Sequence, residues 1–216
     1  MRDSYADIAA LAEVDLSAKP DAYSEAMRHA YRQDKDLSGA MAIAWAGIGR
    51  LLAMAHESEP GRANDLRSQA KALTYDLASY TWAGWDEPGI VITPPEARAG
   101  CAAARANLAL AVELGKGELP QARGHWMLGA HELAAGRPDD ARESFETAAR
   151  LCDTAGPEGT AEAALARAFV MLTDLSAGSA DEAELNAAVE RLRSVPGGAG
   201  LADQVTTARA ALDIGS

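Results

Sequence analysis

The amino-acid sequence predicts an all-α protein, and three observations support this fold class. Fifty of the 216 residues are alanine, which has the highest intrinsic helix propensity, and only two are phenylalanine. No long run of β-branched or aromatic residues competes with this signal by favouring strands. Turn residues divide the chain into about ten segments in which apolar residues recur at spacings of three and four. Because the side chains are small, we expect helices that pack closely on one another.

The first half of the chain contains five expected helices. They cover about 3–15, a segment that starts within 17–21 with Pro20 near its first turn, and about 37–57, 61–82 and 95–114. Apolar residues run almost all the way round the third of these, which is typical of a central helix.

The second half contains five more expected helices, separated by short Gly- and Pro-containing turns. They cover about 119–135, 138–153, 157–176, 181–193 and 201–212. Asp139 and Asp140 stand at the start of the second of these, where the helix dipole favours acidic residues. Short connections between helices make neighbouring helices antiparallel, so this order predicts stacked helical hairpins in a single domain over 1–216.

Charge and composition argue against several classes of partner. The formal net charge is −12, which repels nucleic-acid phosphates and anionic lipids. The longest apolar run, 41–54, is interrupted by Arg50 and is shorter than the roughly 20 residues of a membrane span. The first residues do not resemble a secretory signal, so we expect a cytoplasmic protein in which Cys101 and Cys152 are reduced packing residues.

One hairpin carries a recognisable repeat pattern. From residue 128 the chain reads LGAHELAAGRPDDARESFETA, in which the Leu-Gly pair at 128–129 is followed by Gly136, Ala141, Phe145 and Ala148 at successive steps of seven, five, four and three residues. This pattern resembles the tetratricopeptide repeat. The motif match covers 122–153, and over the rest of the chain the resemblance lies in the order of helical hairpins. The resemblance implies a right-handed α-α superhelix, a non-catalytic role and a concave groove that binds a protein or peptide.

The same register singles out several residues of the helix 119–135. It would place Arg123 and Trp126 toward the groove, where a guanidinium and an indole suit an extended peptide or a carboxylate. His125 and Glu132 replace aromatic residues of the family pattern and lie seven residues apart, on nearly the same helical face. They could form a proton-transfer pair or a buried hydrogen-bonded pair that only satisfies its own polar groups.

The segment YTWAGWDEPGIV at 80–91 lies mostly in the expected loop 83–95, which is longer than most helix connections. Trp82 and Trp85 offer too much apolar surface to remain in water, so we expect this loop to dock on the helices. Asp86 could present a carboxylate beside a tryptophan-lined pocket, or it could serve the turn that Pro88 and Gly89 complete.

Signatures of catalysis and of cofactor binding are missing from the sequence. The four histidines are scattered, HELAAG lacks the second histidine of a zinc-binding HExxH motif, and GKGELP lacks the residues of a phosphate-binding loop. We therefore expect no cofactor and no metal. The first hypothesis is a protein- or peptide-binding scaffold. The alternative is a small-molecule-binding protein or enzyme whose pocket is formed by the loop 83–95 and the helix 119–135. A homodimer formed through the alanine-rich terminal helices also remains open.

Overall fold

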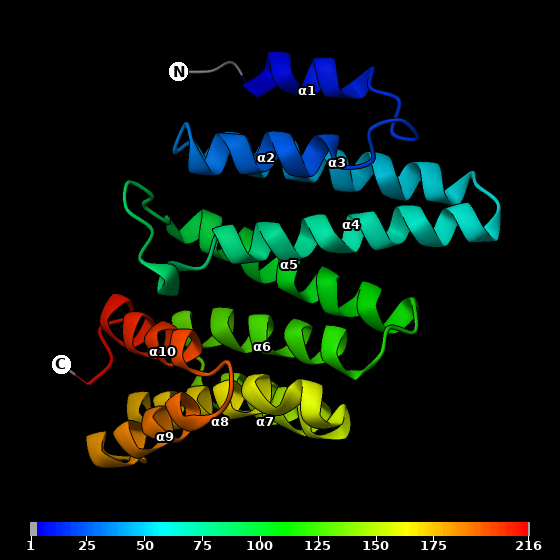
Figure 1. The fold of residues 1–216 in the computed structure, drawn as a ribbon. Helices are drawn as coiled ribbons and strands as arrows, with labels where there is room; N and C mark the ends of the chain where they lie inside the picture. The colour runs from blue at the N-terminus through cyan, green and yellow to red at the C-terminus, as the bar shows by residue number, and fades with distance from the viewer. Residues whose placement is uncertain (1–3, 216) are drawn as a thin grey trace. The chain divides into compact units, whose positions relative to one another are not determined.

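The fold is known from a computed structural model that describes residues 4–215 (Figure 1). All regular secondary structure in this range is helical, which confirms the all-α fold class. The described residues form two compact units. Unit 1 contains the residues up to Thr81 together with Gly89–Leu114, and unit 2 contains Trp82–Pro88 together with the residues from Gly115 onward. The single domain expected over 1–216 stays a prediction.

Unit 1 consists of five helices, each of which packs on the next along the chain. Their bounds are α1 Ser4–Ala12, α2 Ala22–Arg32, α3 Leu37–His56, α4 Pro60–Tyr80 and α5 Pro94–Glu113. The expected start of the first helix at residue 3 lies outside the described residues. Pro20 was expected in the first turn of the second helix, but it precedes α2, because Asp21 is the residue at the N-cap.

The long apolar helix α3 is the core helix of unit 1. On length and composition alone it is the one helix among the described residues that could cross a membrane. Its buried residues contact α1, α2 and α4 instead. Arg50, which interrupts the apolar run, donates hydrogen bonds of 2.7 Å and 2.8 Å to the carbonyl oxygens of Leu11 and Val14. These contacts at the end of α1 are those expected of a cation at a helix C-terminus.

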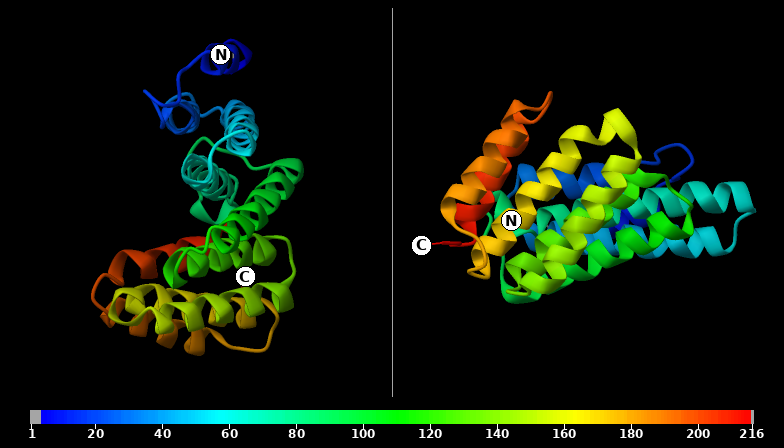
Figure 2. Two further views of the ribbon diagram at one scale, coloured as in Figure 1. Left: turned by 90° about the vertical axis from the view of Figure 1, so that its right-hand side faces the viewer. Right: turned by 90° about the horizontal axis from the view of Figure 1, so that it is seen from below.

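Unit 2 consists of five α-helices, two short 3₁₀ helices and the connections between them. Their bounds are η1 Ala83–Trp85, α6 Glu118–Ala134, α7 Pro138–Thr154, η2 Gly156–Gly159, α8 Thr160–Ser176, α9 Glu182–Ser194 and α10 Ala199–Ala211. Helices α6 to α9 pack in chain order, and α10 contacts α8, α9 and η1 (Figure 2). The expected helix over 157–176 starts at Thr160, because Gly156 has a positive φ and opens a 3₁₀ turn instead.

The hairpin of α6 and α7 is held together by the residues of the repeat pattern. A Cβ atom at Gly129 would lie 3.0 Å from the Phe145 ring and 3.1 Å from the carbonyl oxygen of Ala141, so glycine permits this close approach. The ring of Phe145 is fully buried. Gly136 adopts a φ of +69° in the turn, a conformation that favours glycine. The small residues and the single aromatic ring therefore set the spacing of α6 and α7.

Candidate functional site

A groove on unit 2 is lined by one face of each of α7, α8 and α9. Each helix contributes residues at positions i, i+3, i+4 and i+7, which share one helical face. These residues are Glu146, Ala149, Arg150 and Asp153 on α7, Ala164, Arg167, Ala168 and Met171 on α8, and Ala188, Arg191 and Leu192 on α9 with Val195 at its C-cap; Val170 on α8 also lines the groove. The cavity has a volume of about 690 Å³, within the range of ligand-binding clefts.

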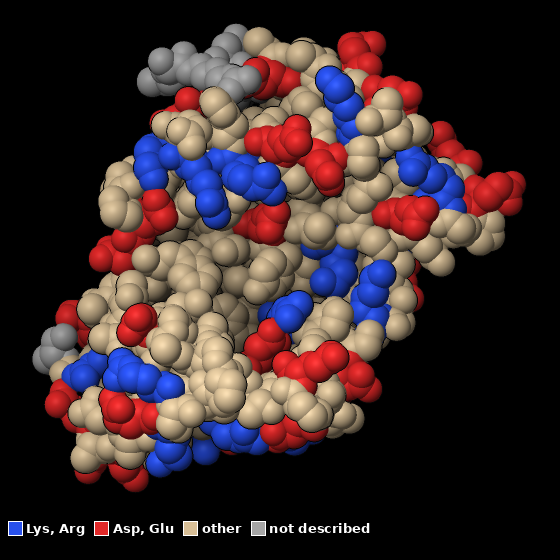
Figure 3. Space-filling view, in the orientation of Figure 1, with Lys and Arg blue, Asp and Glu red and all other residues tan. Residues whose placement is uncertain are grey.

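Every one of the three faces combines small or apolar side chains with one arginine. The arginines are Arg150 on α7, Arg167 on α8 and Arg191 on α9, and α7 also carries Glu146 and Asp153. In Figure 3, Lys and Arg side chains are visible along the lower edge of the molecule, over α7 and α9. The groove is therefore an apolar surface with a charged rim, in a chain whose net charge is −12.

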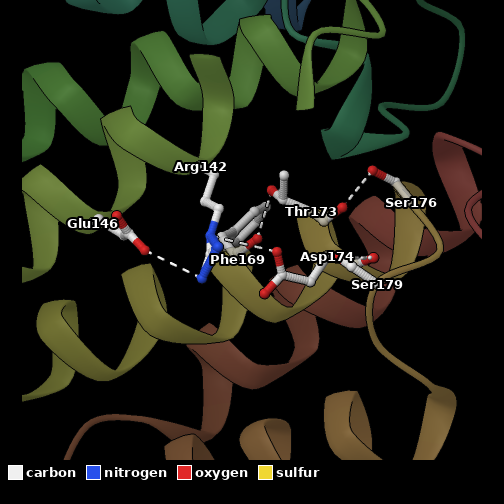
Figure 4. A network of polar contacts seen from close by, with 7 residues as sticks. All are labelled: Arg142, Glu146, Phe169, Thr173, Asp174, Ser176 and Ser179. Atoms are coloured by element: carbon white, nitrogen blue, oxygen red, sulfur yellow. Dashed lines mark hydrogen bonds and ion pairs between the residues drawn. The ribbon is translucent and has the colours of Figure 1, made fainter. Parts of the chain in front are cut away.

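Glu146, the first α7 residue of the groove lining, belongs to an ion-pair network that links α7 to α8 (Figure 4). The guanidinium of Arg142 lies 3.3 Å from the carboxylate of Glu146 on the same helix and 3.5 Å from that of Asp174 on α8. The hydroxyl of Ser179 donates a hydrogen bond of 3.1 Å to the carbonyl oxygen of Asp174, and so holds the turn after α8. Glu146 is thus engaged within the protein.

The loop tryptophans dock inside unit 2, as the loop's apolar surface led us to expect. Trp82 is 1% exposed, and its indole Nε1 donates a hydrogen bond of 3.0 Å to the carbonyl oxygen of Ala130 on α6. Its ring meets those of Trp85 and Trp126 edge to face, at centroid distances of 4.7 Å and 5.5 Å. Such geometry is favourable for aromatic pairs. Helix η1, which carries Trp85, packs against α6 and α10.

Trp126, which the repeat register places toward a groove, is covered by the rings of its own chain. It is 7% exposed and contacts Phe145 and Phe169 as well as the loop tryptophans. Within residues 4–215 its buried Nε1 has no hydrogen-bond acceptor. The loop segment Trp82–Pro88 therefore occupies the surface beside Trp126 that a bound peptide was expected to use.

Asp86 lies in the turn that ends η1 and is exposed to solvent. Its φ and ψ are 49° and 44°, a left-handed conformation that aspartate tolerates better than most residues, and its backbone N–H donates to the carbonyl oxygen of Ala83. Gly84 lets this turn close, since a Cβ atom there would lie 2.2 Å from the Trp82 ring. The position of Asp86 fits the turn interpretation.

His125 and Glu132 do not form the pair that their shared face suggested. Seven residues rise about 10 Å along a helix, so the two side chains start two turns apart. Buried Glu132 accepts a hydrogen bond of 2.8 Å from the hydroxyl of Ser144 on α7 and lies 3.9 Å from Arg137. Burial lowers the pKa of His125, the guanidinium of Arg150 lowers it further, and the carboxylate of Glu143 opposes both. The surroundings of His125 therefore favour the neutral imidazole.

Arg123 is engaged across the helices of unit 2. Its Nη2 and Nε lie 2.6 Å and 3.1 Å from the Oε1 atom of Glu162 on α8. A guanidinium held by two of its nitrogens is an oriented contact that links α6 to α8. The structure thus brings Trp82, Trp85 and Trp126 together, whereas Arg123 and Glu132 make separate structural contacts and Asp86 stands in the turn.

Cys152 lies in an apolar environment that disfavours its thiolate. Burial raises the pKa of Cys152 to about 11, and neighbouring Glu162 and Asp153 raise it as well. Its thiol packs against Ala122 and Ala163 in a small apolar cluster. Among residues 4–215, no group of three or more His, Cys, Asp or Glu side chains is placed to hold a metal ion.

Comparisons with protein-family models, with curated proteins and with solved structures find no match to this chain. The site must therefore be judged on its own geometry.

Sequence reasoning missed the α7–α9 groove, although a signal for it is present. Each of three successive helices carries an arginine in a stripe at positions i, i+3, i+4 and i+7, and the rest of the stripe is small or apolar on α8 and α9. Such a stripe is hard to separate from a buried one in the sequence, because an arginine can extend its charged end to solvent from an apolar surface. Only the packing of α7, α8 and α9 shows that the three stripes line one cavity.

Proposed function

We propose that this chain is a non-catalytic, tetratricopeptide-like scaffold of the cytoplasm that binds a segment of another protein, and that the segment lies in the α7–α9 groove. The observation that carries the proposal is the cavity of about 690 Å³ lined by matching faces of three helices. Amphipathic peptides commonly bind to apolar grooves of this kind between helices.

The packing of α6 on α7 supports the tetratricopeptide-like part of the proposal. Gly129, Ala141 and Phe145 occupy the close contact between the two helices, and Gly136 forms the turn. These are the roles that the repeat pattern assigns to such residues, and hairpins of this kind bury their remaining faces by stacking on one another. Because such hairpins stack, we also propose the superhelical arrangement of the family.

The choice of groove follows from what already covers Trp126. A ligand at that position would have to displace Trp82, whose buried indole is hydrogen-bonded to Ala130. Fully burying an aromatic side chain stabilises a protein by roughly 1.5–3 kcal/mol, which a competing ligand would first have to overcome. Binding of a ligand in the α7–α9 groove requires no such displacement.

A non-catalytic role is supported by how the polar groups near the tryptophans are used. Glu132 is held by Ser144 and Arg137, and Arg123 is held by Glu162. An acid or base for catalysis needs access to a reacting atom, and buried groups that are satisfied by internal contacts lack it. Neither Glu132 nor Arg123 therefore favours the enzyme alternative over the scaffold.

The test is a selection for binding peptides followed by a variant that fills the groove. A displayed library of random 16-residue peptides is selected on the intact chain, and the binders are mapped by backbone NMR shifts. We expect shifts on α7, α8 and α9, and loss of binding in Ala164→Trp, because Ala164 is half-buried in the groove lining and a large ring there occupies the cavity.

The matched control is Ala161→Trp, which changes a half-buried residue of the same helix outside the groove lining. Circular dichroism must show that both variants keep their helicity. Binders that ignore Ala164→Trp and shift signals elsewhere would refute the groove assignment, and so would a selection that enriches no peptide.

A further inference from the structure

We propose that the segment bound in the α7–α9 groove is an acidic amphipathic helix, whose carboxylates pair with Arg150 and Arg191 while its apolar side chains fill the cavity. This inference rests on the proposed function, because it specifies the chemistry of the ligand at the same groove.

The first step is that both acidic residues of the groove lining already have a basic partner within the protein. Glu146 pairs at 3.3 Å with Arg142, which it shares with Asp174, and Asp153 pairs with Arg167. Neither carboxylate depends on a ligand for an ion pair. Arg167 is likewise occupied, since its guanidinium holds Asp153 from the neighbouring helix.

The second step is that the two remaining arginines of the lining have no acidic partner. Within residues 4–215, Arg191 forms no ion pair, and Arg150 makes only a hydrogen bond of 2.8 Å to the neutral hydroxyl of Thr147. Both side chains are exposed. A guanidinium cannot be deprotonated at physiological pH and presents a fork of donors that matches a carboxylate. The uncompensated charge of the lining is thus positive.

The third step concerns the floor of the groove. Between the two arginines the lining consists mostly of small or unbranched side chains, including Ala149, Ala168, Ala188 and Met171. Small side chains leave room for large apolar side chains of a ligand, and methionine adapts its shape to them. A ligand that presents leucine or aromatic side chains at i, i+3, i+4 and i+7 would bury them here.

The fourth step is that a single helical ligand can contact both the arginines and the small apolar side chains of the groove. Arg150 and Arg191 stand on α7 and α9, the two helices that flank α8 in the chain order of packing. A helix laid along the groove would present its apolar face to the alanines and carry acidic residues on both flanks of that face. The net charge of the chain is −12, so attraction for carboxylates at this groove has to come from the local charge of its arginines.

The experiment uses the most enriched peptide from the selection, made synthetically and labelled with fluorescein. A counterpart peptide carries Gln and Asn in place of every Glu and Asp. Binding of both peptides to the intact chain, to Arg150→Gln and to Arg191→Gln is measured by fluorescence polarisation. The matched control is Arg193→Gln, an exposed arginine of α9 that pairs with Glu190 and Asp203 and does not line the groove.

We expect each groove variant to weaken binding of the acidic peptide by about two- to fivefold, as for an accessible ion pair, and to leave binding of the neutral counterpart unchanged. Arg193→Gln should leave both affinities unchanged, and circular dichroism of the peptide should show helix on binding. Arg150→Lys should recover part of the loss, because it restores the charge without the fork.

Three results would overturn the inference. One is an enriched peptide without acidic residues, and another is an equal loss for both peptides in the arginine variants. The third is a dimer of the free chain, seen by light scattering, that Arg150→Gln dissociates, since it would assign the groove to a second copy. If Ala164→Trp still abolishes binding in the first two cases, the assignment of binding to the groove is retained and only the proposal of an acidic ligand is refuted.

Discussion

The two buried indoles of unit 2 give a sharp test of the packing around the loop, because they differ in one hydrogen bond. Trp82 and Trp126 are 1% and 7% exposed and belong to the same aromatic cluster. The Nε1 of Trp82 donates to the carbonyl oxygen of Ala130, whereas the Nε1 of Trp126 has no acceptor within residues 4–215. Replacement of each by phenylalanine removes the same atoms but different interactions.

Trp82→Phe should lower the free energy of unfolding more than Trp126→Phe does. The first change loses a hydrogen bond worth about 0.5–1.5 kcal/mol, together with ring contacts that cost about 1 kcal/mol more. The second removes a buried donor whose burial costs about 1–3 kcal/mol, which offsets its loss of ring contacts. The difference between the two variants should therefore be at least about 1 kcal/mol. Trp82→Ala should cost about 3–5 kcal/mol, because it leaves a cavity as well.

The assay is urea unfolding followed by tryptophan fluorescence in a Trp45→Phe background. Trp45 lies in unit 1 and is 40% exposed, so its removal leaves fluorescence from unit 2 alone and should itself change stability little. Each variant keeps at least two of the three clustered tryptophans as reporters. At a slope of about 1–3 kcal/mol per molar urea, the loss expected for Trp82→Ala moves the midpoint by about 1 M or more.

Equal losses in Trp82→Phe and Trp126→Phe, or the reverse order, would refute this account of the loop. A loss of less than about 0.5 kcal/mol in the free energy of unfolding of Trp82→Ala would be stronger evidence against it, because losses of that size are typical of surface substitutions. It would mean that Trp82 is not buried against α6 in solution.

Three further outcomes follow from single positions. Gly84→Ala should destabilise unit 2 by about 1–3 kcal/mol in the same urea assay, because its Cβ would lie 2.2 Å from an indole. Gly200→Ala, in α10 of the same unit with nothing within 4 Å, should be neutral or stabilising, and similar effects of the two changes would contradict the turn geometry. Burial raises the pKa of Asp76 above 3.8, so its protonated form contributes stability that is complete below pH 3.8 and is lost as pH rises through the raised value. Asp76→Asn should remove that part of the pH dependence of the melting temperature and be at least as stable as the parent at pH 7; a less stable variant would speak against it. Burial raises the pKa of Cys152 to about 11, so at pH 8 iodoacetamide should label half-buried Cys101 well before it, as intact-mass spectra would show, and equal labelling rates would disprove the burial.

Much of the helical architecture could be predicted from local patterns. Most expected boundaries lie within a residue or two of the observed ones, as for 119–135 against Glu118–Ala134. Spacings of three and four report which face of a segment is apolar, and proline and glycine mark where a helix starts and ends. The three corrections, at the end of the first helix (expected at about 15, observed at Ala12), at Pro20 and at the start of α8, concern turns whose φ and ψ depend on their neighbours.

The candidate site was less predictable, because its properties depend on residues far apart in the sequence. Composition could show that Trp82 and Trp85 would dock, but not that Trp82 would donate to Ala130, which is 48 residues away. A shared helical face suggested a pair between His125 and Glu132, but Glu132 accepts a hydrogen bond from Ser144 on the next helix. These polar groups form hydrogen bonds to residues of other segments, whereas helical spacing describes the faces of one helix at a time.

The sequence by itself determined the all-α class, the order of the helices and the small residues that let α6 approach α7, because these follow from propensity, periodicity and turn chemistry. Only the tertiary structure decided that Trp82–Pro88 covers Trp126 and that three separate stripes meet in one groove. It also decided which arginines of that groove are paired, since Asp153 lies beside Arg167 while Arg150 and Arg191 form no ion pair within residues 4–215. The physical reason is that burial and ion pairing depend on distances between helices, which no local pattern encodes.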